Sequence, residues 1–263
     1  MIDGGQEMDA LDWPAAAVLG EDGTAPVVLV CEHASAFIPP ALKGLGISDE
    51  ARHSHVAWDI GALDLAKRLS VRLNAPLVAG QISRLVYDCN RPLEAPDSIP
   101  AKSEIYDVPG NADLNFADRK ARFDRIHTPF HAAVERVMTA RAAASEQSVT
   151  LITVHSFTPV YFGKRREIEL GFLFHTRGEI AEAAVDIETE QGVMKAAVNA
   201  PYSASDGVTY TLQKHAEARG LNAVMIEVRN DLIDTEAKAE VVADHLAQTL
   251  SAAIARATSG GAA

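Results

Sequence analysis

Short apolar runs rich in β-branched residues recur along this chain, and longer segments with the apolar spacing of a helix separate them. PVVLVC at residues 26–31, SVTLITV at 148–154 and NAVMIEV at 222–228 are clear examples. Continuous apolar runs of this length are typical of strands buried on both faces of a sheet. Because parallel neighbours must be joined by a crossover, such strands alternating with helices favour a mainly parallel or mixed central sheet with helices on both faces. The sequence therefore predicts an α/β fold.

The same criteria place the remaining elements. Further strands are predicted at residues 76–79, 84–87, 169–174 and 196–198. Helices are predicted from Ser48 through an apolar side that ends at Leu69, and at residues 116–145, 179–190, 208–219 and 235–257. The segment 90–115 is rich in Pro, Asp, Ser and Gly, which predicts a long loop. No repeat or linker divides the chain, so we expect a single domain over residues 1–258 and a frayed tail at 259–263.

Composition and charge limit the partners of the chain. Its 263 residues carry a net charge of −12, whereas a nucleic-acid partner needs a basic face. No run approaches the roughly 20 apolar residues of a membrane helix. Residues 1–11 show no basic start followed by an apolar stretch, so no signal peptide is expected. We therefore expect a cytoplasmic protein with no membrane or nucleic-acid partner, in which Cys31 and Cys89 are free buried thiols.

Polar residues gather where the predicted strands end. In sheets of this kind ligands bind beyond the carboxyl ends of the strands, so these residues are the first candidates for a site. Two histidines and a glutamate at three strand ends would converge on one rim, as a metal and a hydrolytic base require. The residues at the four strand ends are Glu32 and His33; Arg84, Asp88, Asn90 and Arg91; His155 and Ser156; and Glu227 and Arg229.

Six segments, in this order, resemble the N-formylglutamate amidohydrolase family: EHAS (residues 32–35), HVAWDIGALDLA (55–66), SRLVYDCNRP (83–92), VHSFTP (154–159), PYSASDGVTYTLQKHA (201–216) and IEVRNDLI (226–233). This family is similar in fold to the zinc carboxypeptidases, so the resemblance implies a phosphorylase/hydrolase-like, zinc-carboxypeptidase-like catalytic domain. It also implies a cytoplasmic, metal-dependent amidohydrolase of histidine degradation. The expected reaction is hydrolysis of the amide of an N-acyl acidic amino acid, most directly N-formyl-L-glutamate to formate and L-glutamate.

The resemblance implies one divalent metal per chain, and His33 and His155 are the best neutral nitrogen ligands by their positions. Two histidines suit zinc, or another divalent transition metal, better than magnesium. For the third ligand Asp59 and Glu32 remain open. Asp59, expected on the helix that follows, is favoured because Glu32 is adjacent to His33 on an extended chain, where neighbours point to opposite faces. His55 is an alternative ligand or an outer partner.

Glu227 and Arg84 are the predicted catalytic residues. A carboxylate beside the metal can accept the proton of the attacking water, which is the role we expect for Glu227. Arg84 is expected to polarise the scissile carbonyl group. The alternative for Glu227 is a buried ion pair with Arg229, since buried carboxylates are usually paired.

The substrate implied by the resemblance carries two carboxylates, and arginine binds a carboxylate through two parallel hydrogen bonds. Asn90 and Arg91 resemble the pair that grips a substrate carboxylate in the zinc carboxypeptidases, although Arg91 could instead pair with Asp88. Arg229 and Asp206 complete the predicted substrate-binding set. The expected partner is thus a small dicarboxylate N-acyl amino acid, and a homo-oligomer remains open.

Further alternatives stay open at this point. The basic run at residues 164–166 is either a solvated loop or part of the site. His127 and His131 lie four residues apart on one predicted helix face, but Pro129 lies between them and no glutamate is suitably placed, so a structural role is favoured. The chain could also hydrolyse another N-acyl amino acid or a small amide, or it could be a non-catalytic member of the fold that binds a metal or ligand.

Overall fold

A seven-stranded mixed sheet with the order β1-β3-β2-β6-β11-β9-β10 forms the centre of the computed structural model, which describes residues 13–259. The neighbours β2, β6 and β11 run parallel, whereas β1 and β9 pair antiparallel with β3 and β11. The strands of this sheet are β1 (Ala16–Leu19), β2 (Val27–Cys31), β3 (Leu77–Gly80), β6 (Thr150–Phe157), β9 (Leu170–Leu173), β10 (Ala196–Val198) and β11 (Asn222–Arg229).

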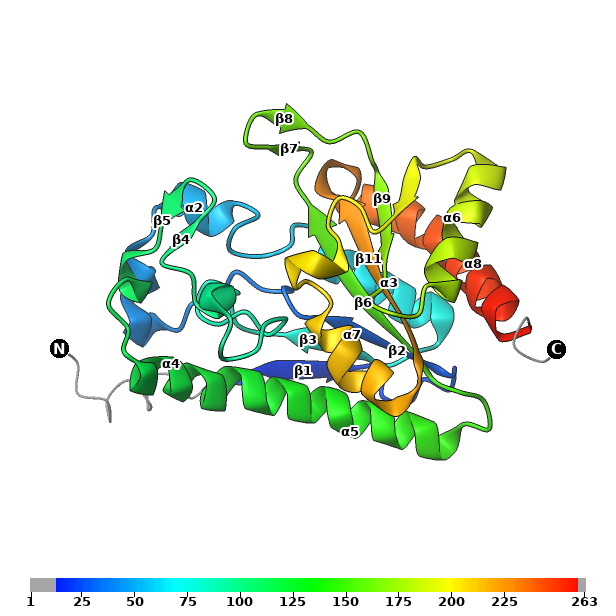
Figure 1. The fold of residues 1–263 in the computed structure, drawn as a ribbon, viewed down its shortest axis with the longest axis horizontal. Coiled ribbons are helices and arrows are strands. Elements are labelled where there is room, and N and C mark those ends of the chain that lie inside the picture. Colours follow the sequence, from blue (N-terminus) through cyan, green and yellow to red (C-terminus); the bar gives the residue numbers. More distant parts are fainter. Residues whose placement is uncertain (1–12, 260–263) are drawn as a thin grey trace.

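Helices cover both faces of the sheet (Figure 1). The α-helices of the described residues are α2 (Asp49–His53), α3 (Ala62–Leu73), α4 (Phe116–Arg122), α5 (Thr128–Ala144), α6 (Glu179–Gln191), α7 (Tyr210–His215) and α8 (Glu236–Ser259). The helices α3, α6 and α8 share one hydrophobic core with the sheet, and α5 and α7 share the other. Alternate strand residues enter the two cores: Val28 and Val30 belong to the α5 side, whereas Leu29 and Cys31 belong to the α3 side.

Short elements connect this framework. Two hairpins, β4 (Lys102–Ser103) with β5 (Tyr106–Asp107) and β7 (Val160–Tyr161) with β8 (Lys164–Arg165), project from it. Neither hairpin nor β1 is predicted from the sequence, because strands this short carry little periodic signal. A π-helical turn, η4 (Phe123–His127), joins α4 to α5. The 3-10 helices are η1 (Pro40–Gly46), η2 (Pro96–Ser98), η3 (Pro109–Asn111), η5 (Ala204–Asp206), η6 (Glu217–Arg219) and η7 (Asn230–Leu232).

The predicted α/β class, with a mixed sheet between helical layers, is confirmed. The two cysteines are free and buried, as expected. No helix within residues 13–259 is long and apolar enough to cross a membrane. Ser259 is the last residue of α8. Residues 1–11, considered for a signal peptide, and the rest of the expected tail lie outside the described residues.

The strand predicted at residues 84–87 is wrong. Ser83 turns the chain there: its hydroxyl oxygen accepts from the Leu85 N–H at 3.2 Å, and its carbonyl oxygen accepts from the Val86 N–H at 2.9 Å. Serine side chains offer the backbone such local partners in place of a strand ladder. The apolar residues Leu85, Val86 and Tyr87 are nevertheless buried, so hydrophobicity alone indicates burial here and not strand geometry.

The single helix predicted between Ser48 and Leu69 is also wrong, because α2 and α3 are separate helices with turns between them. Gly61, at φ 78°, precedes α3, and a Cβ there would lie 2.2 Å from the carbonyl oxygen of Ile233. This left-handed, closely packed position suits glycine and sets the direction of the turn. Asp59 therefore lies in a turn and not on a helix. The helix predicted at residues 208–219 is likewise shorter and continues as η6.

Candidate active site

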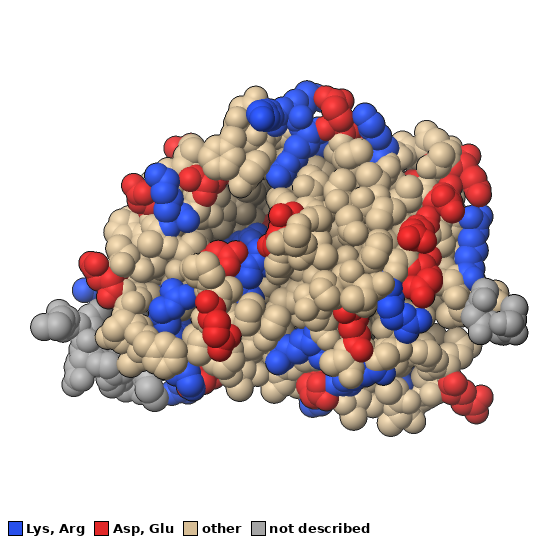
Figure 2. Space-filling view, viewed as in Figure 1, with Lys and Arg blue, Asp and Glu red and all other residues tan. Residues whose placement is uncertain are grey.

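The carboxyl ends of β2, β6 and β11 meet at one edge of the sheet. His155 in β6 is the register partner of Glu227 in β11, and Glu32 and His33 directly follow β2. These ends open into a cavity of about 600 Å³, the hollow visible below the β7–β8 hairpin in Figure 2. The predicted residues that line it are His33, Asp59, Arg84, Asn90, Arg91, Asp206 and Glu227.

Three buried side chains, those of His33, Asp59 and His155, converge at the base of this edge. Asp59 Oδ2 lies 2.8 Å from His155 Nδ1 and 3.3 Å from His33 Nδ1. Ligand atoms of the three residues all lie within 4.8 Å of one another. Asp59 reaches this point because its N–H donates to the His33 carbonyl oxygen at 2.9 Å. Two imidazole nitrogens and a carboxylate oxygen form a donor set typical of catalytic zinc.

A carboxylate lies behind each imidazole. His33 Nε2 is 2.7 Å from Asp88 Oδ1, and His155 Nε2 is 3.1 Å from Glu32 Oε2. A proton on each Nε2 leaves both Nδ1 atoms as lone-pair donors that face the same point. The side chains present therefore fit a divalent metal, with the two Nδ1 atoms and Asp59 Oδ2 as ligands. Because Glu32 contacts the far nitrogen of His155, the arrangement favours Asp59 as the third ligand.

Neighbouring charges shift the pKa values in this group. Burial by itself would raise the pKa of Asp59, but the charge of His33 and the hydrogen bond from His155 hold that pKa far below its usual range. Burial would lower the pKa of His155, but Glu32 and Asp59 raise it well above its ordinary value. Negative charge thus predominates around the two imidazoles, and a bound cation would balance it.

Arg84 joins the two aspartates of the site. Its Nη1 donates to Asp59 Oδ1 at 3.2 Å, and its Nη2 donates to Asp88 Oδ2 at 3.1 Å. The remaining oxygens of these carboxylates are the ones that contact the histidines. Arg84 therefore orients both carboxylates, a role that its planar fork of donors suits. Its action on a substrate carbonyl group stays a prediction.

Glu227 lines the cavity and is 5% exposed. Its Oε2 has no hydrogen-bond partner among residues 13–259. Burial, opposed by His155 and reinforced by Asp59, raises the pKa of Glu227 to about 7. The alternative ion pair with Arg229 does not form, because Arg229 pairs with Asp231 at 2.8 Å. A carboxyl group with a near-neutral pKa in a cavity is suited to proton transfer.

Asn90 and Arg91 line the cavity and hold the loop beside it. Asn90 Nδ2 donates to the Val208 carbonyl oxygen at 2.5 Å. Arg91 donates from Nε to Asp97 at 2.7 Å and from Nη1 to the Gly207 carbonyl oxygen at 2.9 Å. These bonds position the loop that follows η5, so the two residues shape the cavity even before a substrate is considered.

The other predicted substrate-binding residues differ in position. Asp206 lines the cavity and accepts a hydrogen bond from the Ser203 N–H at 2.8 Å. Arg229 is absent from the described lining of the cavity. The alternative pairing of Arg91 with Asp88 is replaced by separate ion pairs, since Asp88 contacts Arg84 and Arg91 contacts an aspartate of the long loop.

The cavity wall also contains residues that no sequence pattern assigns to a substrate-binding role. His55, weighed as an alternative ligand, pairs with Glu104 at 2.7 Å instead. Within the basic run at 164–166, Arg166 lines the cavity, whereas Lys164 and Arg165 do not. The hairpins and loops contribute Lys102, Ser103, Glu104, Tyr161, Arg166 and Tyr202. These positions depend on loop geometry, which local sequence periodicity does not encode.

His127 and His131 are packed inside the protein. His131 bonds the Cys89 carbonyl oxygen at 2.8 Å and His215 at 2.7 Å, and its ring stacks on that of His215. His127 stacks on Phe123. Neither His127 nor His131 belongs to the described cavity lining. Both pack against other side chains inside the protein, which favours a structural role.

This histidine cluster predicts a loss of stability in acid. Burial lowers the pKa of His127 and of His131 to about 3, and that of His215 to about 4, against about 6.5 in an unfolded chain. The unfolded chain thus binds more protons between these values, so stability is full above pH ~6.5 and declines as pH falls. We expect each histidine to cost on the order of 1–2 kcal/mol at pH ~5, measured by urea unfolding.

A matched variant separates this effect from general acid damage. His127→Phe keeps an aromatic ring beside Phe123 and Tyr87 and removes one titrating group. We expect the stability of His127→Phe to fall less between neutral pH and pH ~5 than that of the wild type. An identical fall in both proteins would contradict the assignment to His127.

The chain is similar to known proteins over most of its length. A family model described as N-formylglutamate amidohydrolase matches residues 25–234. A crystal structure of a gene product from Agrobacterium tumefaciens is 45% identical, with a TM-score of 0.89, and the match covers 92% of this chain and 96% of that one. An N-formylglutamate amidohydrolase from Ralstonia eutropha JMP134 is 17% identical, with a TM-score of 0.63, covering 93% and 98%. No curated protein sequence matches.

Proposed function

Because this chain belongs to the N-formylglutamate amidohydrolase family, we propose that it is a metal-dependent enzyme that hydrolyses the amide of an N-acyl acidic amino acid, with N-formyl-L-glutamate as its substrate. One observation carries the proposal. Beside one cavity, the buried group of His33, Asp59 and His155 lies close to the carboxylate of Glu227, whose Oε2 has no hydrogen-bond partner among residues 13–259. Metal-dependent amide hydrolysis uses such a pairing of metal ligands with a proton acceptor.

Each residue of the site then has a distinct chemical role. A divalent metal held by His33, Asp59 and His155, preferably zinc, would supply Lewis acidity that activates water and polarises the amide carbonyl group. Glu227 accepts the proton of the attacking water and returns it to the departing amine. Its pKa of about 7 allows both transfers near neutral pH, because neither protonation state is strongly favoured.

Asp88 holds a ligand in place and offers a test of the metal site. Asp88→Asn keeps an acceptor oxygen for His33 Nε2 but removes the charge that Arg84 and His33 share. We expect metal affinity to fall by roughly 10–100-fold, as for other partners behind metal-bound histidines. Competition for the metal with a coloured chelator measures this affinity. Asp97→Asn, at a half-exposed aspartate bonded to Arg91, is the control, and equal affinities in both variants would count against the site.

Substrate recognition completes the proposal. Asn90, Arg91 and Asp206 line the cavity, and we assign them to the substrate pocket. We assign Arg229 a supporting role, because its Nη1 donates to the carbonyl oxygen of the cavity residue Arg166 at 3.4 Å. Because the protein carries a net charge of −12, a dianionic substrate depends on local arginines. Arginine provides the two-pronged contact that a carboxylate prefers.

Formate release from N-formyl-L-glutamate by the purified, metal-analysed protein tests this function, with N-acetyl-L-glutamate and a neutral N-acyl amino acid as comparisons. Formate release that depends on stoichiometric metal supports it. Turnover of N-acetyl-L-glutamate alone would shift the assignment to another N-acyl amino acid. Bound metal without hydrolysis of any of these amides would favour a non-catalytic binding protein.

A further inference from the structure

The positively charged side chains around the cavity differ in whether they form an ion pair with a carboxylate. Its described lining contains four Lys or Arg side chains. Arg84 and Arg91 pair with aspartates, and Lys102 lies 3.5 Å from Asp107. Arg166 has no carboxylate within 4.0 Å among residues 13–259. A guanidinium group that faces a cavity without a counter-ion is free to bind an anion that enters it.

Aromatic rings hold this guanidinium group in place. Its central carbon lies 4.5 Å from the ring centre of Tyr161, 4.9 Å from that of Tyr202 and 5.5 Å from that of Phe157. Its Nη1 donates to the Tyr202 hydroxyl oxygen at 3.1 Å and to the Thr158 carbonyl oxygen at 3.4 Å. Aromatic faces attract a cation and restrict its motion, and they leave its charge available. Arg166 is thus oriented but not neutralised.

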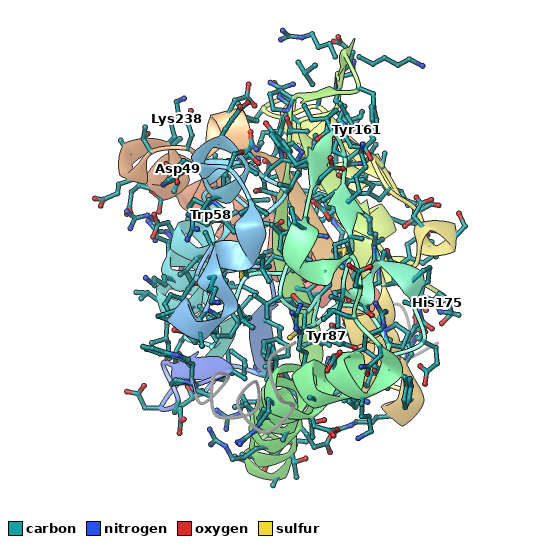
Figure 3. The ribbon with its side chains drawn as sticks, turned by 90° about the vertical axis from the view of Figure 1, so that its left-hand side faces the viewer. Asp49, Trp58, Tyr87, Tyr161, His175 and Lys238 are labelled. Atoms are coloured by element: carbon teal, nitrogen blue, oxygen red, sulfur yellow. The ribbon has the colours of Figure 1, made fainter. Side chains whose placement is uncertain are left out.

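The hairpin places Arg166 at the upper side of the cavity. Tyr161, whose ring lies against Arg166, is near the top of the molecule in Figure 3, on the β7–β8 hairpin, whereas Trp58, the neighbour of Asp59, lies lower. In Figure 2, Lys and Arg side chains gather over this hairpin, above the hollow. The reacting amide must instead meet Glu227 and the His33 group at the sheet edge. A substrate that spans the two places therefore needs its second charge at some distance from the amide.

We propose that Arg166 binds the side-chain carboxylate of the N-acyl amino acid and so determines the selectivity of the enzyme for acidic side chains, an inference that rests on the proposed function. The α-carboxylate is attached to the same carbon as the amide nitrogen and stays beside the sheet edge. The side-chain carboxylate extends toward the hairpin. The hydroxyl group of Tyr202 accepts a bond from Arg166, and its own proton remains available as a further donor to the same carboxylate.

Three substrates that differ by one charge test this assignment: N-formyl-L-glutamate, N-formyl-L-glutamine and the α-amide of N-formyl-L-glutamate. For Arg166→Gln we expect the preference in kcat/KM for N-formyl-L-glutamate over N-formyl-L-glutamine to fall by roughly 10–100-fold, the effect of one charge-assisted contact. The preference over the α-amide should stay unchanged. Arg166→Lys, which keeps the charge and loses the fork, should give a smaller fall.

Arg165→Gln is the matched control. It removes the same charge from the neighbouring residue, whose side chain is 71% exposed, and we expect wild-type selectivity. An equal loss of kcat/KM on all three substrates in Arg166→Gln would indicate a structural role and overturn the proposal. A change confined to the α-amide comparison would also overturn it, because Arg166 would then bind the α-carboxylate.

A binding measurement keeps this inference separate from the proposed function. Glutarate, a dicarboxylate without an amide, is titrated calorimetrically into zinc-loaded wild type, Arg166→Gln and Arg165→Gln. Weaker binding only in Arg166→Gln supports the anion site even if no amide is hydrolysed, in which case the proposed function alone fails. Equal glutarate binding by all three proteins overturns the role of Arg166 while leaving hydrolysis intact.

Discussion

His33→Ala is expected to lose the bound metal and its hydrolytic activity while the protein stays folded. The substitution removes one of two nitrogen donors that converge with Asp59, and two remaining ligands hold a divalent metal poorly. Asp88 keeps its bonds to Arg84 and to the Asn90 N–H, so no buried charge is stranded. We expect less than about a tenth of an equivalent of metal and a fall in kcat of at least ~10³-fold.

His155→Ala should lose metal to the same extent but should also lower stability. His155 Nε2 lies 3.1 Å from Oε2 of buried Glu32, whose two carboxylate oxygens have no hydrogen-bond partner among residues 13–259. Leaving a buried charge uncompensated is costly. Metal analysis after dialysis, together with thermal unfolding, separates the two variants. His53→Ala, at an exposed histidine of α2, is the control, and retained stoichiometric metal in both site variants would sink the ligand assignment.

Glu227→Gln is expected to lower kcat by roughly 10²–10⁴-fold with metal content unchanged. The amide of glutamine keeps the size and hydrogen-bonding capacity of the carboxylate but cannot accept the proton of the attacking water. The substitution should not reduce stability, because the carboxylate it replaces is buried without a hydrogen-bond partner at Oε2 among the described residues. Steady-state kinetics on N-formyl-L-glutamate and metal analysis of the same preparation measure both quantities.

Glu104→Gln provides the matched comparison for Glu227→Gln. Glu104 is another carboxylate of the same cavity, but it pairs with His55, so we expect a much smaller effect on kcat. Loss of metal from Glu227→Gln would make Glu227 a ligand and would require another base. Near-normal turnover in Glu227→Gln would contradict the assignment of Glu227 and weaken the proposed function.

The class of the fold and many of the candidate residues can be predicted from the amino-acid sequence alone. Apolar runs such as residues 26–31 and 148–154 are long enough to identify buried strands without knowledge of their partners. Once the strands are assigned, the rule that ligands bind beyond their carboxyl ends selects His33, His155 and Glu227. The strand predictions at residues 26–31, 148–154 and 222–228 are confirmed, because they depend on local hydrophobicity, which a single sequence carries. The roles of the three residues stay predictions.

Which of those candidates contact one another depends on the tertiary structure. Asp59 and Glu32 are both acids near His33 in the sequence, but the turn before Gly61 brings Asp59 to the Nδ1 atoms, whereas Glu32 contacts the far nitrogen of His155. Such a choice depends on contacts between segments far apart in the chain, and no local pattern records them.

The surroundings of the arginines also depend on the tertiary structure. From the sequence, Arg84, Arg91 and Arg229 are candidate site residues near strand ends, and Arg166 belongs to a basic run that is either a solvated loop or part of the site. In the folded chain Arg84, Arg91 and Arg229 form ion pairs with carboxylates. Arg166 instead lines the cavity and contacts aromatic rings. Residue type and spacing determine that a charge is present. Which counter-charges lie within reach of it is decided by the packing of hairpins and loops, because an ion pair forms through space and not along the chain.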